Sequence, residues 1–471
     1  MNVFQPTVRF EDNMDAESTR KYIETHLKEQ PGTKIQYGHP SPRFFKPMAL
    51  TPHDVKHLRR PDRPLFLYIH IPFCPPTDPP ACGFCLFARE DMTSYAAVRN
   101  YLEVLRAELD LYAQVFQGEE LACVYIGGGT PNVLRAPEYG LLFGWIKERF
   151  RVAPGAEVTL EGVPQLFHED RLAAMAEAGV TRVSVGAQQL DDNLLRYSGR
   201  RNTVRHVHDS IEGAHARGMV VNVDLICGWF EQPEDGIARD VSVLLPHQPE
   251  SIVVHPLTLA GQSSFSDARD ALASTEDTKR AFLNGRNFLL QNGYRGTSYT
   301  DYALKNPQRG PDEVQYLRFY REILGYDRLG VGYGANSLFA GTPRSPGATF
   351  RNVASLDTYA ERVQKGHLPI ADGFTFSDVD LSLLYVLKGL EGTPFLTAEG
   401  YRNAVGRDLL ADFGGPLSAL EQIGWLARNG SEYVVQGDGV FYMPVIQRAV
   451  SERRNARLRS AAKLPLSLPV I

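Results

Sequence analysis

The chain has 471 residues, a formal net charge of -5 and 43% hydrophobic residues, which is enough for the packed core of one large domain and one or two smaller ones. The acidic balance gives no basic surface for nucleic acid. No apolar run reaches the length of a signal peptide or the roughly 18 residues of a membrane span, and five cysteines argue against a secreted disulfide framework. We therefore expect a cytoplasmic protein with no membrane span and no nucleic-acid partner.

From residue 65 to about residue 300, short β-rich runs alternate with amphipathic stretches of helical period. A strand is predicted near Tyr299, after six others at 65–70, 121–126, 157–160, 182–185, 220–226 and 251–255. The first predicted helix places apolar side chains at helical spacing, namely Val98, Tyr101, Leu102, Leu105, Leu109 and Tyr112. Further helices are predicted at roughly 137–150, 168–178, 203–217, 234–245 and 274–291. Because six strand–helix units are fewer than the eight of a closed barrel, we predict an α/β fold with a partial (β/α)6, TIM-like barrel of parallel strands.

Three cysteines follow the first predicted strand, in the run Tyr68-Ile-His-Ile-Pro-Phe-Cys-Pro-Pro-Thr-Asp-Pro-Pro-Ala-Cys-Gly-Phe-Cys-Leu-Phe87. Three thiolates can hold three corners of a [4Fe–4S] cube and leave the fourth iron open. A structural zinc site would normally be closed by a fourth Cys or His, and His70 lies in the strand-like run, where it is a poor fourth ligand. The spacing alone leaves two alternatives open, buried thiols and a degenerate zinc site. Cys123 and Cys227 lie inside apolar runs and are expected in the core.

Polar and glycine-rich segments follow the other predicted strands. They are Gly127-Gly-Gly-Thr-Pro131 after the second strand, Glu161 after the third, Gly186-Ala-Gln188 after the fourth, Asp224 near the end of the fifth and His255-Pro256 after the sixth. In βα barrels the active site is built at the carboxyl ends of the strands. We therefore predict a functional site at this edge.

The segment around the cysteines resembles the signature of radical S-adenosylmethionine (SAM) enzymes of the oxygen-independent coproporphyrinogen III oxidase-like (HemN-like) family. Members typically read Tyr-x-His-Ile-Pro-Phe-Cys, then x3-Cys-x2-Cys, and the matching residues are Tyr68, His70, Ile71, Pro72, Phe73 and Phe84. The first gap departs from this pattern, because it has seven residues rather than three. The insertion, 75–81, is rich in proline, and we expect it to shape the substrate mouth.

The resemblance implies a radical SAM barrel and the cofactors that go with it. A [4Fe–4S] cluster is expected on Cys74, Cys82 and Cys85. SAM is expected beside the open iron, where it is reductively cleaved to methionine and a 5′-deoxyadenosyl radical. The glycine-rich segment matches the one that holds the amino group of SAM in relatives, and its residues are Gly127, Gly128, Gly129 and Thr130.

Further site residues are implied by the same resemblance. Glu161, Gln188 and Arg200 match SAM contacts, and Asp224 matches a residue that binds a ribose hydroxyl; relatives often have His where this chain has Asn202. Tyr68 and Phe84 are expected to line the adenine and cluster pocket, although core packing explains either equally well. Ala303 matches a position near a second SAM. The residues predicted to be catalytic are Tyr68, Gln188 and Arg200.

The resemblance covers about residues 63–445. We predict an N-terminal extension at 1–62 that covers the barrel mouth, the radical SAM barrel at 63–310, and a connecting segment at 311–375 that completes the core. A C-terminal domain at 376–471 is expected to be mainly helical and winged-helix-like. Its hairpin is predicted at 433–442, with a Gly437-Asp438-Gly439 turn.

One departure bears on the reaction. Coproporphyrinogen oxidases often carry a further Cys two residues after the third, and this chain has Phe87 there. This pattern fits better the haem chaperones and the methyl- and cyclopropane-forming enzymes of natural-product pathways, such as antibiotic biosynthesis. We therefore predict a radical SAM C1-transferase, a methyltransferase or cyclopropanase of the class C type. It would use two SAM molecules, one as the radical source and one as the C1 donor, and an unsaturated or aromatic small molecule as substrate.

Two alternatives stay open at this point. One is oxidative decarboxylation of coproporphyrinogen III, and the other is a haem chaperone that keeps the cluster but does little catalysis. The partners expected are a small-molecule substrate, an electron donor such as flavodoxin or ferredoxin, and a partner methyltransferase.

Overall fold

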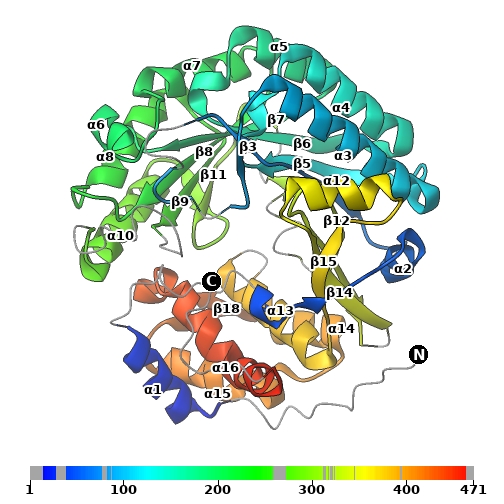
Figure 1. Ribbon diagram of the computed structural model, residues 1–471. Coiled ribbons are helices and arrows are strands. Elements are labelled where there is room, and N and C mark those ends of the chain that lie inside the picture. The colour runs from blue at the N-terminus through cyan, green and yellow to red at the C-terminus, as the bar shows by residue number, and fades with distance from the viewer. Residues whose placement is uncertain are drawn as a thin grey trace.

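A 13-stranded sheet runs through the chain, in the order β1-β15-β14-β13-β12-β2-β5-β6-β7-β8-β9-β11-β10. This architecture comes from a computed structural model (Figure 1). The residues that it describes are 14–27, 39–76, 82–85, 87–257, 272–310, 314–316, 318, 322, 324–343, 345–392 and 395–462.

The middle of this sheet is the predicted barrel. Its strands are β2 (Leu65–Ile71), β5 (Glu120–Gly128), β6 (Arg151–Gly162), β7 (Arg182–Gln188), β8 (Val220–Cys227) and β9 (Ser251–Pro256). All neighbours in this series pair in parallel. The sheet is curved, and its carboxyl-terminal edge brings the predicted site segments together (Figure 1). The prediction of a partial parallel barrel is confirmed.

Helices follow these strands and cover the convex side of the sheet, where they form an outer arc (Figure 1). They are α3 (Tyr95–Phe116), α4 (Ala136–Arg149), α5 (Glu169–Ala178), α6 (Asp192–Tyr197), α7 (Val204–His215), α8 (Gly236–Leu244) and α10 (Thr275–Gln291). Polar side chains cap several of their first turns; the Ser94 hydroxyl, for example, accepts a hydrogen bond from the Ala97 amide at the start of α3. The apolar residues predicted for the first helix are all buried in α3.

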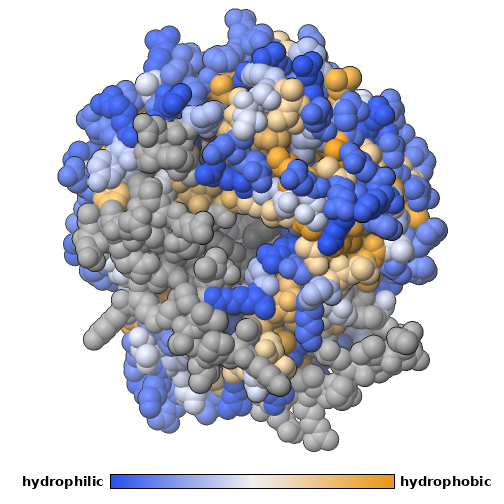
Figure 2. Space-filling view, viewed as in Figure 1, coloured by the Kyte–Doolittle hydropathy of each residue, from blue (hydrophilic) through white to orange (hydrophobic). Residues whose placement is uncertain are grey.

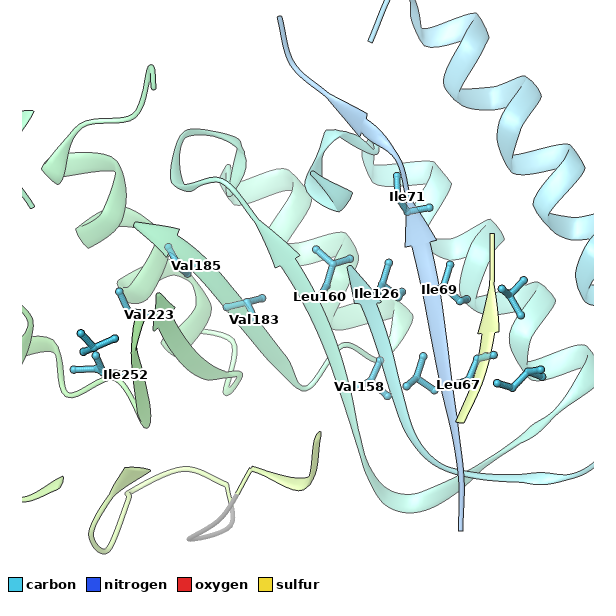
Figure 3. Close-up of a cluster of buried hydrophobic side chains, with 14 of the residues drawn as sticks. Leu67, Ile69, Ile71, Ile126, Val158, Leu160, Val183, Val185, Val223 and Ile252 are labelled. Carbon is cyan, nitrogen blue, oxygen red and sulfur yellow. The ribbon is translucent and has the colours of Figure 1, made fainter. Parts of the chain in front are cut away.

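The two faces of the barrel sheet differ in chemistry because strand side chains alternate. Figure 3 shows branched aliphatic side chains from six neighbouring strands in one cluster, among them Ile69, Ile126, Leu160, Val183 and Val223. These side chains pack against the helices. The concave face instead carries buried polar side chains, including Thr159, Arg182, Ser184, Asn222 and Ser251. A polar inner face is costly unless its groups bond to one another or to a ligand.

The flanks of the sheet extend the barrel beyond the six predicted strands. β12 (Asp327–Val331) pairs in parallel with β2, so the parallel array has one more strand than predicted. Antiparallel strands continue from it: β13 (Asn336–Thr342), β14 (Ser345–Asn352), β15 (Ile370–Thr375) and β1 (Lys46–Pro47). Helix α12 (Leu356–Gln364) connects β14 to β15. At the other flank, the single strand predicted near Tyr299 is a hairpin of β10 (Tyr294–Gly296) and β11 (Asp301–Leu304), with Tyr299 in its turn.

The C-terminal unit lies below the opening of the barrel (Figure 1). It contains α13 (Asp378–Glu391), α14 (Ala398–Val405), α15 (Leu409–Gln422), α16 (Met443–Ala461) and a small sheet of β16 (Leu396–Thr397), β18 (Glu432–Val435) and β17 (Leu426–Asn429). Helices with a three-stranded wing agree with the predicted shape. The hairpin prediction was wrong in its position, because the turn lies between Asn429 and Glu432 and the predicted Gly-Asp-Gly turn is a 3-10 helix, Gly437–Val440.

Contacts join the C-terminal unit to the barrel rim. The Lys279 ammonium of α10 contacts the Asp438 carboxylate at 2.7 Å, and Ser298, in the β10–β11 turn, forms a β-bridge with Gly392. Figure 2 shows that this face of the molecule is hollowed near its centre, between the barrel and the C-terminal unit.

The described part of the N-terminal region does not lie in one place. Helix α1 (Ala16–His26) packs on α15 and α16, α2 (Pro52–Leu58) packs on α3, and β1 joins the sheet beside β15. The predicted domain limits stay predictions. Among the helices that the structure describes, none combines the length and apolar character needed to cross a bilayer.

Candidate active site

The loop of the three cysteines begins where β2 ends. Two backbone hydrogen bonds close its base, from the Glu90 amide to the Pro72 carbonyl and from the Met92 amide to the Cys74 carbonyl, both at 2.9 Å. These bonds form the short parallel pair β3 (Phe73–Cys74) and β4 (Glu90–Asp91). Most of the predicted insertion, 77–81, lies outside the described residues, so its role stays a prediction.

The three thiols lie close enough to influence one another. Burial raises the pKa of Cys74 to about 11; a hydrogen bond from Thr130 lowers it, and the charges of Cys85 and Cys82 raise it. Burial also raises the pKa of Cys85, while the Phe87 amide, which hydrogen bonds to its sulfur, lowers it. The three thiols are half-buried and free. Cys123 and Cys227 are fully buried in the core, as predicted.

Donors surround the sulfurs from several elements. The Thr130 hydroxyl donates to Cys74 Sγ at 3.4 Å, and Arg200 Nη1 lies 3.9 Å from Cys82 Sγ. The positive charge of Arg89 lowers the pKa of both Cys74 and Cys85. Hydrogen-bond donors and positive charge favour thiolates, the form that binds iron.

The glycine segment lies directly against the cysteine loop. The Gly129 amide donates to the Ile71 carbonyl at 2.9 Å, and Gly128 has a positive φ of 118°. A Cβ on Gly127 would lie 2.7 Å from Glu161 Oε2, and one on Gly128 would lie 2.8 Å from His70 Nε2. Only glycine fits such close approaches, so this segment packs tightly against Glu161 and His70.

Glu161 lies at the end of β6 with its carboxylate beside this segment. Its Oε2 accepts from the Gly128 amide at 3.3 Å, and its Oε1 accepts a short hydrogen bond from the Tyr125 hydroxyl. Burial raises the pKa of Glu161 to about 7; the Tyr125 hydrogen bond lowers it and the charge of Asp224 raises it. A carboxylate placed this way favours a cationic ligand that restores its full charge.

Asp224 is held by a chain of polar side chains on the concave face. Its two oxygens accept from the Ser184 hydroxyl at 2.9 Å and from the Asn222 amide at 2.8 Å, and the Ser251 hydroxyl donates to Asn222 Oδ1 at 2.7 Å. Burial raises the pKa of Asp224, and the nearby charge of His255 lowers it. The carboxylate is therefore fixed in orientation and keeps acceptor capacity toward the mouth.

Gln188 and Arg200 meet near the end of β7. Gln188 has a left-handed φ of 69°, at a register shift between β7 and β8. Arg200 donates to the Gly186 carbonyl, and its Nε donates to Asn202 Oδ1 at 2.7 Å. Asn202 therefore orients the guanidinium. A strained backbone supported by its surroundings is common at ligand sites.

The two aromatic candidates pack in different side-chain clusters. The Phe84 ring packs 5.3 Å from Trp229, in a cluster with Ile226 and Phe230. The Tyr68 ring stacks on Tyr125, with centroids 6.2 Å apart, and burial raises its pKa far above the usual value.

Ala303 is not brought to the mouth. It pairs with Ser251, the first residue of β9, whereas the mouth lies at the other end of that strand, near His255. Leu257, which no sequence motif singled out, lies at the mouth end, where its amide donates to the Cys227 carbonyl at 2.7 Å and its side chain packs in the cluster of Trp229. Sequence reasoning also missed Tyr125. Its position two residues before Gly127 could have indicated it, because residues two apart in a strand lie on the same face of β5.

The comparisons with known proteins agree with this geometry. Residues 68–244 match the Radical SAM superfamily. The chain contains a radical SAM domain. It is 29% identical over 324 residues to an oxygen-independent coproporphyrinogen III oxidase of Paracoccus denitrificans, covering 67% of this chain and 70% of that protein. It is 28% identical over 274 residues to the heme chaperone HemW of Escherichia coli, covering 58% and 70%.

A solved structure shows the same fold. The coproporphyrinogen III oxidase HemN from Escherichia coli superimposes with a TM-score of 0.74 and 21% identity, covering 89% of this chain and 96% of the other. At this identity the likeness concerns the fold alone. It confirms the predicted radical SAM fold with its C-terminal helical region.

The radical SAM domain implies a [4Fe–4S] cluster and SAM, and the residues at the mouth fit both. Among the described residues, no three His, Cys, Asp or Glu side chains converge on a single metal ion. A cube takes each thiolate at a different iron. Cys74, Cys82 and Cys85 are the thiols available for it.

Proposed function

We propose that this radical SAM enzyme acts on a porphyrinogen and that its reaction is oxidative decarboxylation of coproporphyrinogen III. The similarity to the Paracoccus denitrificans oxidase carries this proposal, because the 324 aligned residues extend well beyond the radical SAM region 68–244. The C1-transfer reaction favoured from the sequence is less well supported, since the curated relatives compared above are coproporphyrinogen oxidases and haem chaperones.

The residues at the mouth divide the work of holding the cofactors. Cys74, Cys82 and Cys85 would hold the cluster, which together with SAM supplies hydrogen abstraction when bound. The backbone of Gly127–Gly129 and the Glu161 carboxylate would receive the SAM ammonium, because a carboxylate with a raised pKa gains most from a cation.

The remaining SAM groups find complementary partners. Asp224, oriented by Ser184 and Asn222, would accept hydrogen bonds from ribose hydroxyls. Arg200 and Gln188 would contact the carboxylate end, since a guanidinium suits carboxylate recognition. These residues together would hold one SAM molecule, and a second SAM stays a prediction.

The reaction sets requirements that the mouth meets in part. Each propionate that becomes a vinyl group loses CO2, one hydrogen atom and one electron, so an external one-electron acceptor is needed. The cluster needs an external donor, and flavodoxin or ferredoxin stays the prediction for it. The C-terminal unit, joined to the rim through Lys279–Asp438 and Ser298–Gly392, would limit the access of water to the reacting groups.

Phe87 favours the other candidate functions. It is 66% exposed and follows Cys85, whose sulfur accepts from its amide. An exposed aromatic ring at this place suits stacking on a flat ligand such as haem or on an aromatic C1-acceptor. Haem binding and S-adenosylhomocysteine formation should therefore be measured beside decarboxylation.

The deciding experiment is anaerobic reconstitution of the full chain with iron and sulfide, reduction of the cluster with stoichiometric dithionite, and addition of SAM, coproporphyrinogen III and a one-electron acceptor, with products analysed by mass spectrometry. Loss of CO2 from the porphyrinogen together with 5′-deoxyadenosine supports the proposal. S-adenosylhomocysteine without decarboxylation points to C1 transfer. Tight haem binding without substrate-dependent SAM cleavage points to a chaperone. A Cys85→Ala chain treated identically controls for cluster-independent chemistry.

A further inference from the structure

His70 lies on the concave face of β2, between the two loops that meet at the mouth. Its side chain is buried, with 4% of the residue exposed. Its Nε2 lies 2.9 Å from the Ala88 carbonyl oxygen, and its Nδ1 lies 3.0 Å from the Tyr68 hydroxyl. Both ring nitrogens are therefore engaged, and neither is free to bind a metal.

The partners fix the tautomer of this imidazole. Burial lowers the pKa of His70 to about 4, so the ring is neutral near neutral pH. A carbonyl oxygen can only accept a hydrogen bond, so Nε2 carries the proton and donates to Ala88. Nδ1 is then the acceptor for the Tyr68 hydroxyl. Every polar atom of the ring has a complementary partner.

The Ala88 carbonyl belongs to the returning arm of the cysteine loop, three residues after Cys85. The backbone pairs at Pro72–Glu90 and Cys74–Met92 close the base of this loop. The His70 bond adds a side-chain anchor to the same arm, closer in the chain to Cys85. It therefore restrains the position of the arm relative to the barrel strand.

The Nε2–Cδ2 edge of the ring also lies against the glycine segment. A Cβ on Gly128 would lie 2.8 Å from His70 Nε2, so the segment is in direct contact with the imidazole. The backbone of His70 is anchored as well, because its carbonyl accepts from the Tyr101 hydroxyl of α3 at 2.5 Å. One rigid side chain thus contacts both the arm that carries Cys85 and the segment beside Glu161.

We propose that His70 is a positioning residue that sets the separation between the cysteine loop and the Gly127–Thr130 segment, and so fits SAM to the cluster. The proposal rests on the cofactor assignment at this mouth and not on the porphyrinogen substrate. A SAM molecule that contacts both loops would bind with full affinity only when their separation is fixed, because ordering a loose loop costs binding free energy.

Three variants of the full chain separate this role from simple stability. His70→Leu fills a similar volume but cannot donate to Ala88, whereas His70→Gln places an amide donor at the reach of Nε2. His39→Leu is the matched control, because His39 is also 4% exposed and hydrogen bonds to Asp380 at 2.6 Å in the C-terminal unit. Each is reconstituted anaerobically, its iron and sulfide content is measured, and SAM is titrated while the electron paramagnetic resonance spectrum of the reduced cluster is recorded.

We expect His70→Leu to keep its cluster and to need about tenfold or more additional SAM for the spectral change, since a buried carbonyl is left without its donor. His70→Gln should recover most of that loss, and His39→Leu should lower the melting temperature without moving the SAM titration. Unchanged SAM titration in His70→Leu overturns the proposal, and so does an equal loss in His70→Gln. If His70→Leu fails to fold, His70→Asn, whose shorter amide does not reach the Ala88 carbonyl, takes its place: a larger SAM requirement in His70→Asn than in His70→Gln supports the role, and equal curves overturn it.

Discussion

Two of the tyrosine–glutamate hydrogen bonds in this molecule contrast with each other, one at the mouth and one behind the sheet. At the mouth, Glu161 accepts from the Tyr125 hydroxyl and, at 3.3 Å, from the Gly128 amide. Behind the sheet, Glu108 of α3 accepts from the Tyr359 hydroxyl at 2.7 Å. Burial raises the pKa of both carboxyls to about 7. The two pairs thus share residue types and a perturbed pKa.

The two pairs differ in which other groups donate hydrogen bonds to the carboxylate. Glu108 is fully buried and also accepts from the Gly332 amide at 2.7 Å and from the Asn352 side chain at 2.8 Å. Protein donors therefore satisfy the hydrogen-bonding capacity of this carboxylate. Glu161 is half-buried and lies against the glycine segment. A perturbed pKa alone therefore does not identify a functional carboxylate. Hydrogen-bonding capacity that the protein itself leaves unsatisfied is the better indicator.

The cysteines show the same contrast between a side chain at the mouth and one in the core. Their substitution has the largest expected effect. Cys85 is half-buried at the mouth, whereas Cys227 is fully buried and donates to the Thr278 carbonyl at 3.4 Å. Cys85→Ala should lower bound iron and sulfide after reconstitution by at least about tenfold, because a cube held by two thiolates is labile. Cys227→Ala should keep its iron and lose on the order of 1 kcal/mol of stability through a small cavity. Iron and sulfide analysis of both variants checks this, and equal iron in the two would remove the distinction between mouth and core.

The glutamate pair gives the next largest effect. Glu161→Gln should raise the Kd of SAM by at least about thirtyfold, because a charged partner of the ammonium is lost. Glu108→Gln should leave that Kd unchanged and lower the free energy of unfolding by about 1–3 kcal/mol, since an amide NH2 would face the Asn352 donor. SAM titration and denaturant unfolding of both variants test the crossed pattern. Loss of SAM affinity in Glu108→Gln would show that the two carboxylates do not have separate roles.

Local patterns in the sequence were sufficient to predict much of this site. Strand alternation and glycine runs predicted the parallel strands and placed Gly127–Thr130, Glu161 and Asp224 at one edge, because both signals are carried by adjacent residues. The motif around Cys74 and Cys85 pointed to the radical SAM domain. The roles of the individual residues stay predictions, since the structure gives their positions and not their contacts with SAM or a cluster.

Pairing between distant segments was not predictable in the same way. β12 joins β2 across more than the whole length of the barrel segment, and no local signal states that partner. Ala303 was matched to a position near a second SAM, and the antiparallel register of β11 on β9 places it beside Ser251, at the amino end of β9. The Gly437-Asp438-Gly439 triplet has turn chemistry, yet the strands pair around the earlier turn at Gly430, whose φ is 63°. Register depends on partners that a single segment does not specify.

The two tyrosines give a smaller effect than their glutamates. Tyr125→Phe removes a hydrogen bond that lowers the pKa of Glu161, so the carboxyl should ionise at higher pH in the variant. SAM affinity should fall by about tenfold near neutral pH and recover as the pH rises, because the ammonium prefers the carboxylate. Tyr359→Phe should leave the pH profile of SAM binding unchanged. The Kd of SAM measured from about pH 6 to about pH 9 separates them, and parallel profiles for the two variants would contradict the assignment of Tyr125.

The smallest expected effect is a pH dependence of stability that belongs to Glu108. Its pKa is raised from 4.5 to about 7 on folding, so the folded chain binds a proton more tightly than the unfolded chain. The associated stability is fully present below about pH 4.5, falls as the pH rises, and is lost above about pH 7.

Glu108→Gln should therefore show a shallower fall of unfolding free energy with pH than the unaltered chain, by on the order of 1 kcal/mol over one pH unit near pH 6. Glu161 and Asp240, whose pKa values are also raised to about 7 by burial, titrate in both proteins and cancel in the difference. Denaturant unfolding at several pH values, without cofactors, measures it. A difference of the opposite sign would mean that Tyr359, Gly332 and Asn352 stabilise the ionised carboxylate, and Glu108 would then resemble a filled anion site more than a neutral core acid.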